Sequence, residues 1–243
     1  MSRSRTIDVP GAQGAAPEFL VTPETLDAVS PPGDRGGMVI GSDAAGNALA
    51  ASVLRPQPTR MVGVGGLYLA RLLALRAMAT GAWVLIATGR PAAWKMLERA
   101  AGQTPDGKPV PLVQVRRLEP FALPRSSEDT PLLVIHDGGA VPQELFPPRA
   151  PWQTTLYVLP YLHPQVSSGA AANTADLVLL QRLPLNQAQL AQRIWTLHPQ
   201  QAHQLTQLKD DQAIALGNML WSQIRLVTQD KEQEILGPVR RGD

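Results

Sequence analysis

From residue 59 onward, short apolar runs alternate with longer segments whose apolar residues recur at helical spacing. Apolar runs bounded by glycine, proline or polar turns are typical of parallel strands buried on both faces. The pattern predicts strands at residues 61–64, 82–87, 112–115, 132–135, 155–159 and 176–180. Helices are predicted at residues 67–80, where Gly81 ends the helix, and from Pro91 to Gly102. This alternation favours parallel strands joined by right-handed crossovers.

The two ends of this alternating region carry different patterns. Apolar segments at residues 37–41 and 47–54 flank the turn Ser42–Gly46, which indicates a β-hairpin. In the last quarter, Asn186 is expected to cap a helix and a second helix is expected after Pro199. Two further strands are predicted at residues 213–216 and 224–227. Together these elements predict a single mostly parallel sheet flanked by helices, which is a three-layer α/β sandwich.

The first 35 residues contain five prolines and no periodic apolar pattern. Such a segment is typical of a flexible lead rather than of a packed element. The remainder, residues 36–243, is predicted to form one α/β domain.

Composition excludes several classes of protein. The chain has no cysteine, which rules out thiol catalysis, cysteine-ligated zinc, iron–sulfur clusters and disulfides. Its 22 basic and 20 acidic residues give a net charge of +2, so no nucleic-acid partner is expected. The most apolar stretch, residues 61–89, is interrupted by glycines and contains Arg71 and Arg76, so membrane insertion is not expected. We expect a cytoplasmic protein that reaches a membrane only through a partner.

The turn Gly63-Val-Gly-Gly66 between the first strand and its helix is the best candidate site. A helix N-terminus offers unpaired N–H groups, and glycines let a phosphate approach them. A dinucleotide fingerprint needs a third Gly or Ala at position 68, where Tyr68 stands. A phosphate loop needs Gly-Lys-Ser/Thr before the helix, where Leu67 and Tyr68 stand. These departures favour the alternative interpretation, a tight turn that packs the helix on the sheet.

Two further candidates follow predicted strands. Arg90 ends the second strand of the unit, where an NADP enzyme uses an arginine to hold the 2′-phosphate. The alternative is an exposed loop arginine before the Pro91 helix. Asp137 follows the apolar run 132–135 one residue later than the magnesium-binding carboxylate of nucleotide hydrolases, because His136 takes that position. One residue of slip sends the side chain to the other face of the strand, so a polar strand end is the alternative.

No complete catalytic or metal-binding motif is present. The four histidines lack metal-ligand spacing, and no Gly-x-Ser-x-Gly elbow exists for a serine nucleophile. We therefore predict no catalytic residue, no metal and no bound cofactor. The candidate nucleotide-binding residues are Gly63, Gly65, Gly66, Arg90 and Asp137.

The order of elements resembles a known family. A hairpin with Met38–Asn47, a strand at 59–66, a long buried helix and strands at 82–88 and 132–137 follow one another. This order resembles the RecA-like ATPase domain of FtsK-type translocases, including those of type VII secretion, over residues 36–227. The resemblance implies a RecA-like, P-loop-like sandwich whose Gly63–Gly66 turn matches the phosphate loop without its lysine or hydroxyl residue. It implies an ATPase-like scaffold that docks to a secretion partner or an active translocase ATPase.

Three functional classes follow from these observations. The first is a non-catalytic, ATPase-like interaction subunit of a secretion or translocation machine. The alternative is a Rossmann-type enzyme that binds NADP or S-adenosylmethionine at Gly63–Gly66. A nucleic-acid-handling accessory ranks last, because the charge is balanced. A protein partner is expected to contact weakly charged, glutamine-rich helix faces, namely those carrying Gln189, Gln192, Gln200 and Gln204.

Overall fold

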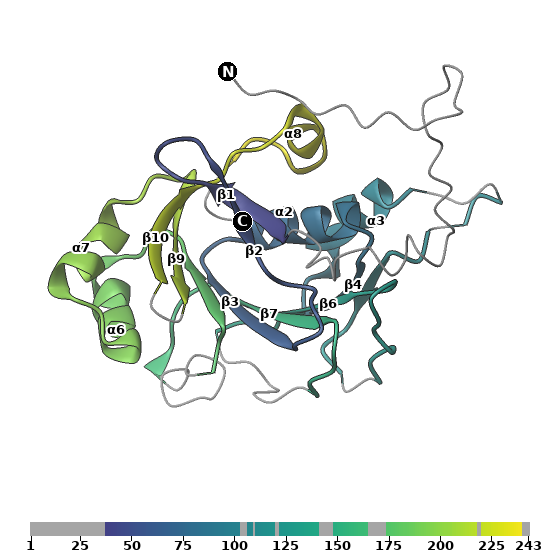
Figure 1. The fold of residues 1–243 in the computed structure, drawn as a ribbon, viewed down its shortest axis with the longest axis horizontal. Helices are drawn as coiled ribbons and strands as arrows, with labels where there is room; N and C mark the ends of the chain where they lie inside the picture. The colour runs from purple at the N-terminus through teal and green to yellow at the C-terminus, as the bar shows by residue number, and fades with distance from the viewer. Residues whose placement is uncertain are drawn as a thin grey trace, which may run out of the picture. The chain divides into compact units, whose positions relative to one another are not determined.

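The computed structural model describes residues 37–102, 106–108, 110–119, 122–140, 148–164, 174–217 and 220–239, within the compact unit Asp34–Asp243. Ten strands form one sheet in the order β2-β1-β10-β9-β8-β3-β7-β6-β4-β5 (Figure 1). The strands are β1 (Met38–Ser42), β2 (Ala48–Ala51), β3 (Thr59–Val64), β4 (Trp83–Thr88), β5 (Val113–Arg116), β6 (Leu132–Asp137), β7 (Gln153–Leu159), β8 (Leu177–Leu180), β9 (Gln212–Gly217) and β10 (Leu220–Arg225). The helices are α2 (Leu67–Ala79), the 3₁₀ turn η1 (Pro91–Trp94), α3 (Lys95–Ala100), α6 (Leu185–Trp195), α7 (Pro199–Gln207) and α8 (Asp230–Leu236).

The sheet has a parallel part and an antiparallel part. The strands β8-β3-β7-β6-β4-β5 run parallel to one another. Strands β9, β10, β1 and β2 extend the sheet through antiparallel pairs. The expected mostly parallel α/β sheet is therefore confirmed. Strand β6 is longer than the apolar run predicts, because it continues through His136 and Asp137 and so directs their side chains to opposite faces.

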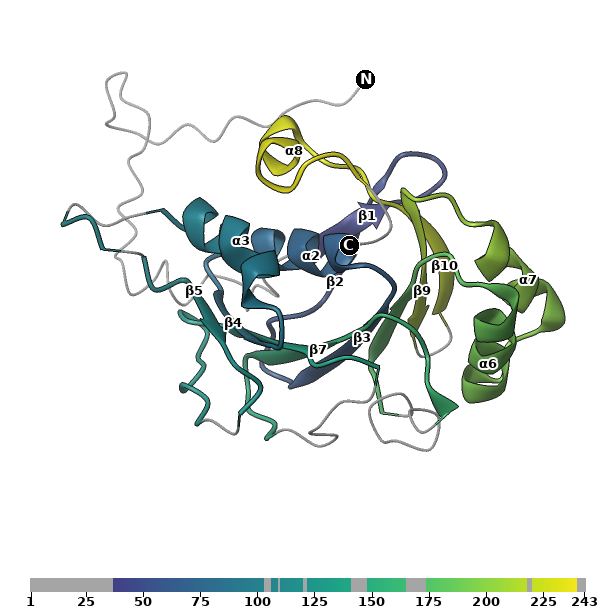
Figure 2. The same cartoon turned by 180° about the vertical axis from the view of Figure 1, so that it is seen from behind.

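One face of the sheet is covered by α2 and α3, and α8 packs on these two helices (Figure 2). Helix α2 is buried over most of its surface, and Leu72 and Leu73 pack in the same core as Ile86 and Ile135 of the central strands. It ends as predicted, because Gly81 adopts φ +84°, a conformation that glycine enters without strain. No helix in the described ranges is long and apolar enough to cross a membrane.

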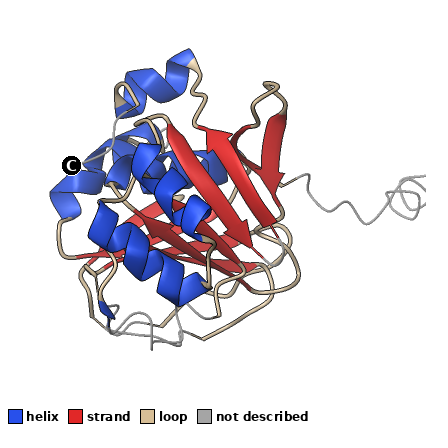
Figure 3. Cartoon of the chain, turned by 90° about the vertical axis from the view of Figure 1, so that its left-hand side faces the viewer, coloured by secondary structure: helices blue, strands red, loops and turns tan. Residues whose placement is uncertain are grey.

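Helices α6 and α7 pack on the opposite face, over β3, β8 and β9 (Figure 3). Ala188, Leu190 and Leu205 bury the apolar sides of these helices. The expected cap at Asn186 is wrong: α6 begins at Leu185, and Pro184 is its N-cap. The proline ring fixes φ at −58°, so the chain enters the helix two residues earlier than the Asn186 side chain predicts.

Arg76 connects distant parts of the chain at the end of α2. Its guanidinium donates to the carbonyl oxygens of Val39 at 3.0 Å and Val227 at 2.6 Å. It also pairs with the carboxylate of Glu232 on α8 at 2.7 Å. One side chain thus joins the β1–β2 hairpin, α2 and the C-terminal helix.

Candidate functional site

The turn Gly63–Gly66 lies where β3 ends and α2 begins, at the carboxyl edge of the parallel strands. Gly65 adopts φ +141°, which residues with a side chain rarely adopt, and its amide donates to the carbonyl of Leu159 at 2.9 Å. Gly66 is the N-cap of α2 and has no side chain to accept a hydrogen bond from the first turn. The helix therefore begins with amide groups that need an acceptor from elsewhere in the chain.

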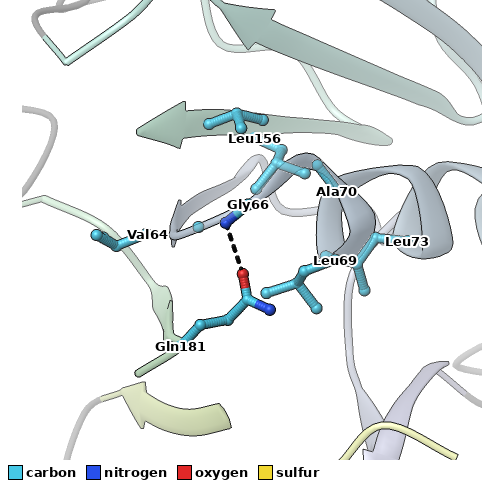
Figure 4. Close-up of a pocket in the computed structure, with 9 residues that line it drawn as sticks. Val64, Gly66, Leu69, Ala70, Leu73, Leu156 and Gln181 are labelled. Carbon is cyan, nitrogen blue, oxygen red and sulfur yellow. Dashed lines mark hydrogen bonds between the residues drawn. The ribbon is translucent and has the colours of Figure 1, made fainter. Parts of the chain in front are cut away.

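Gln181, the residue after β8, supplies such an acceptor (Figure 4). Its side-chain Oε1 accepts a hydrogen bond from the Gly66 amide at 2.8 Å, and its backbone N–H donates to the carbonyl of Val64 at 3.0 Å. The residue is only 1% exposed. A Cβ atom placed on Gly65 would lie 2.3 Å from Oε1, so the Gln181 side chain lies directly against the turn.

Little space remains around this contact. The cavity lined by Gly66, Leu69, Leu73 and Gln181 measures about 10 Å³, the lower limit for holding one water molecule. The Nε2 atom of Gln181 is buried there, and no described residue forms a hydrogen bond with it. A phosphate group would have to displace the Gln181 side chain to reach the Gly66 amide.

Asp137 lies at the end of β6 and is 3% exposed. Its Oδ2 accepts hydrogen bonds from Thr88 Oγ1 at 2.8 Å and Trp94 Nε1 at 2.9 Å. Arg90 donates from Nη2 to Oδ1 at 2.9 Å and from Nε to Oδ2 at 3.0 Å. Both carboxylate oxygens are thus engaged by the segment that follows β4.

The same contacts determine the charge of Asp137. Burial alone would raise the pKa of this carboxyl, because it disfavours the ionised form. The hydrogen bonds from Arg90, Trp94 and Thr88, together with the positive charge of Arg90, outweigh burial and lower the pKa below its ordinary value. Asp137 is therefore an ionised group that organises η1 and the end of β4.

His136 points to the other face of β6, as alternation along the strand requires. Its ring stacks on Tyr157 of β7 with centroids 5.2 Å apart. Burial lowers the pKa of His136, and its buried Nε2 has no hydrogen-bond partner among the residues that the structure describes. Within the described ranges, no group of three His, Asp or Glu side chains is arranged to hold a metal ion.

The structure brings some of the predicted residues together and keeps others apart. Arg90 and Asp137 form an ion pair across neighbouring strands β4 and β6. Gly63, Gly65 and Gly66 lie on β3 and its turn, and β7 and β6 separate β3 from β4 in the sheet. In a Rossmann sheet the first two strands of the unit are neighbours, so this strand order places Arg90 away from where a 2′-phosphate would lie. The strand order therefore gives no geometric support for Arg90 as a 2′-phosphate ligand of a Rossmann-type enzyme.

The glutamine-rich helices present part of the surface that the sequence indicates. Gln189 and Gln200 are exposed, while Gln192 is half-buried. Gln204 is also half-buried and is used internally: its Oε1 accepts from Trp221 Nε1 at 3.1 Å, and its Nε2 donates to Gln223 at 2.9 Å. Gln189 and Gln200 are therefore the residues through which a partner can be tested.

Sequence reasoning did not single out Gln181. Its hydrogen bond to Gly66 joins residues 115 positions apart, so no local motif contains it. The available signal was indirect: a helix without a capping side chain needs an acceptor, and a polar residue directly after a buried strand is a candidate for that role.

Comparison with known proteins gives a fold similarity. No protein-family model matches the sequence, and no curated protein matches it. The structure is similar to that of VirB4 of Thermoanaerobacter pseudethanolicus, with a TM-score of 0.55 and 9% identical residues. The match covers 84% of this chain and 100% of that chain. At this identity the similarity shows the fold alone, and it agrees with the RecA-like α/β architecture that the order of elements indicates.

Proposed function

We propose that this protein is a non-catalytic, ATPase-like scaffold that acts as an interaction subunit of a secretion or translocation machine. The observation that carries the proposal is the contact between Gln181 Oε1 and the Gly66 amide. In an ATPase of this architecture, a nucleotide phosphate accepts hydrogen bonds from the turn before the helix. Here the chain supplies its own neutral acceptor, so the turn has no need of a nucleotide.

The charged groups of the region support the same conclusion. Phosphoryl transfer depends on cations that neutralise the phosphates, commonly a lysine in the turn and a magnesium ion held by a carboxylate. The four lysines of the chain are Lys95, Lys108, Lys209 and Lys231, and none lies in the Gly63–Gly66 turn. The Asp137 carboxylate is engaged by donors from Thr88, Arg90 and Trp94.

The proposed partner is a protein, and an active translocase ATPase is the candidate. The sequence resemblance to FtsK-type translocases and the fold similarity to VirB4 support this class of partner. The surface we assign to the contact is the outer side of α6 and α7 around Gln189 and Gln200. This surface carries few charged residues, so removing water from it costs less than desolvating a face of lysines and glutamates.

Nucleotide binding and turnover test the first half of the proposal. The purified protein is expected to hydrolyse neither ATP nor GTP and to show no melting-temperature shift with ATP, NADP or S-adenosylmethionine. A ligand present at 100 times its Kd adds about 2.7 kcal/mol of stability, which a thermal shift detects readily. Magnesium-dependent turnover that disappears in a folded Asp137→Asn variant would overturn the proposal.

Crosslinking and charge substitution test the second half. A photo-crosslinking residue at 189 or 200 is expected to capture an ATPase of the translocation machinery in the native host. The double variant Gln189→Lys, Gln200→Glu is expected to weaken that complex without lowering the melting temperature. Gln57→Lys, an exposed substitution on a different segment, is the matched control and is expected to bind normally. Normal binding by the double variant would place the interface elsewhere.

A further inference from the structure

Strand β10 is paired along its whole length on one side only. On that side β9 is in register from Leu220 opposite Gly217 to Arg225 opposite Gln212. On the other side β1 meets β10 at a single pair, Ser42 opposite Arg225, and then turns back into its hairpin with β2. In the part of the chain that the structure describes, Leu220–Ile224 thus form an open edge inside the sheet.

One hydrogen bond fixes the direction of the free backbone groups. The Leu226 amide donates to the carbonyl of Asp211 at 2.7 Å. In an antiparallel pair the bonded residues alternate, so residues 224, 222 and 220 also bond to β9. The intervening residues Trp221 and Gln223 direct their N–H and C=O groups to the open side. Among the described residues, no strand pairs with them there.

The two ends of this edge differ in shape. At one end a cavity of about 480 Å³ is lined by the hairpin turn Ser42–Gly46 and by Gln212, Gln223, Ile224 and Arg225. At the other end Leu220 is 45% exposed. Leu220 and Ile224 lie four residues apart and therefore point to the same side of the strand. A protruding apolar side chain and a cavity thus stand at opposite ends of one strand.

This arrangement is self-complementary. A two-fold axis through Ser222 sets Trp221 opposite Gln223 of the partner subunit, and each pair exchanges both backbone hydrogen bonds. The same axis sets Leu220 opposite Ile224 of the partner subunit, next to its cavity. Residues 220–224 carry no charge, so self-pairing brings no like charges together. By contrast, the edge strand β5 ends in Arg116, and charged edges oppose strand pairing.

We propose that a second copy of this chain occupies the open edge of β10. The two β10 strands pair antiparallel, the two sheets become continuous, and Leu220 of each copy packs beside Ile224 of the other. The contact uses a strand edge rather than the α6–α7 surface, so the proposed dimer stands independently of the proposed function.

Sedimentation of the full-length protein between about 1 and about 100 µM tests the dimer, because small interfaces associate weakly in this range. The wild-type protein is expected to shift from monomer to dimer. Leu220→Lys places a cation against the buried Ile224 of the other copy. Gln223→Pro removes an N–H that no described strand accepts within the monomer. Both variants are therefore expected to remain monomeric. Leu185→Lys alters a side chain that is 65% exposed on α6 and is expected to dimerise like the wild type.

Hydrogen exchange identifies the contact itself. The amides of Trp221 and Gln223 are expected to exchange quickly in dilute protein and to become protected as the concentration rises, while Ser222 and Ile224 are protected throughout. A protein that is monomeric over the whole range would overturn the proposal. So would a dimer that persists in Leu220→Lys and leaves the Trp221 and Gln223 amides unprotected.

Discussion

Two polar clusters lie at the carboxyl edge of the parallel strands, and they differ in charge. Around Gln181 the contact is neutral, between a side-chain amide and the first amide of α2. Around Asp137 an ionised carboxylate accepts hydrogen bonds from Thr88, Arg90 and Trp94. The difference teaches that the chain satisfies the polar groups of this edge in two ways. The Gln181 cluster caps the start of α2, and the Asp137 cluster attaches the segment after β4 to the sheet.

The apolar core beneath both clusters sets the largest expected effect. Leu72→Ala and Ile86→Ala each remove a side chain that is fully buried between α2 and the sheet. Each is expected to lower the free energy of unfolding by about 2–5 kcal/mol, because a cavity remains where the methyl groups were. Urea denaturation measures the loss. Costs under about 1 kcal/mol for both variants would contradict the buried crossover between β3 and β4.

The charged cluster is expected to give the next largest effect. Asp137→Ala leaves the buried donors Thr88 Oγ1 and Trp94 Nε1 without their acceptor, which we expect to cost about 2–3 kcal/mol of unfolding free energy. Asp210→Ala, which removes an exposed partner of Arg182, is the matched control and is expected to cost under about 1 kcal/mol. Equal losses in the two variants would show that Asp137 does not organise the segment after β4.

The neutral cluster is expected to contribute less. Gln181→Ala removes the acceptor of the Gly66 amide, and we expect a loss of about 1–2 kcal/mol by urea denaturation. Gln189→Ala on the exposed side of α6 is the control and is expected to leave stability unchanged. A Gln181→Ala variant as stable as the control would mean that the contact does not hold the turn.

The dependence on pH separates the two clusters most finely. The pKa of Asp137 lies below its ordinary value of 3.8, so its ionised form stabilises the fold above pH 3.8. That contribution falls as the pH drops below 3.8 through the lowered pKa. The stability difference between wild type and Asp137→Asn is therefore expected to narrow there, while the difference for Gln181→Ala stays constant. Urea denaturation at a series of pH values measures both differences. If the difference for Asp137→Asn stays as constant as that for Gln181→Ala, the ionised state of Asp137 does not stabilise the fold.

Much of the parallel sheet is predictable because its signal is local. Each apolar run is bounded by turn residues, and α2 lies between Gly66 and Gly81, so strand and helix positions follow from neighbouring residues. The strand order is not local. Strands β7 and β6 lie between β3 and β4, which depends on which strands pair across the sheet. For this reason the sequence could not show that Arg90 and the Gly63–Gly66 turn lie apart.

The residues of the candidate site likewise differ in whether a local sequence signal reveals them. Asp137 can be singled out from the sequence because it lies one residue beyond the end of an apolar run. Its partner Trp94 cannot, because the contact joins residues 43 positions apart. Gln181 was missed because its contact depends on two strand ends that are adjacent only after folding. Helix α6 shows the remaining local error, since proline geometry at 184 determines its start rather than the capping preference of Asn186.

The ion pair between Arg76 and Glu232 has a consequence for synthesis on the ribosome. Arg76 also binds Val39 and Val227, so the first described strand and the last helix are joined through one side chain. Strand β1 likewise pairs with β10 only after Arg225 has been synthesised. At about 5–20 residues per second, the nascent hairpin waits on the order of ten seconds for these partners. During that interval the apolar side of the hairpin, including Met38 and Ile40, lacks its final cover, and this is the stage at which a chaperone has most to protect.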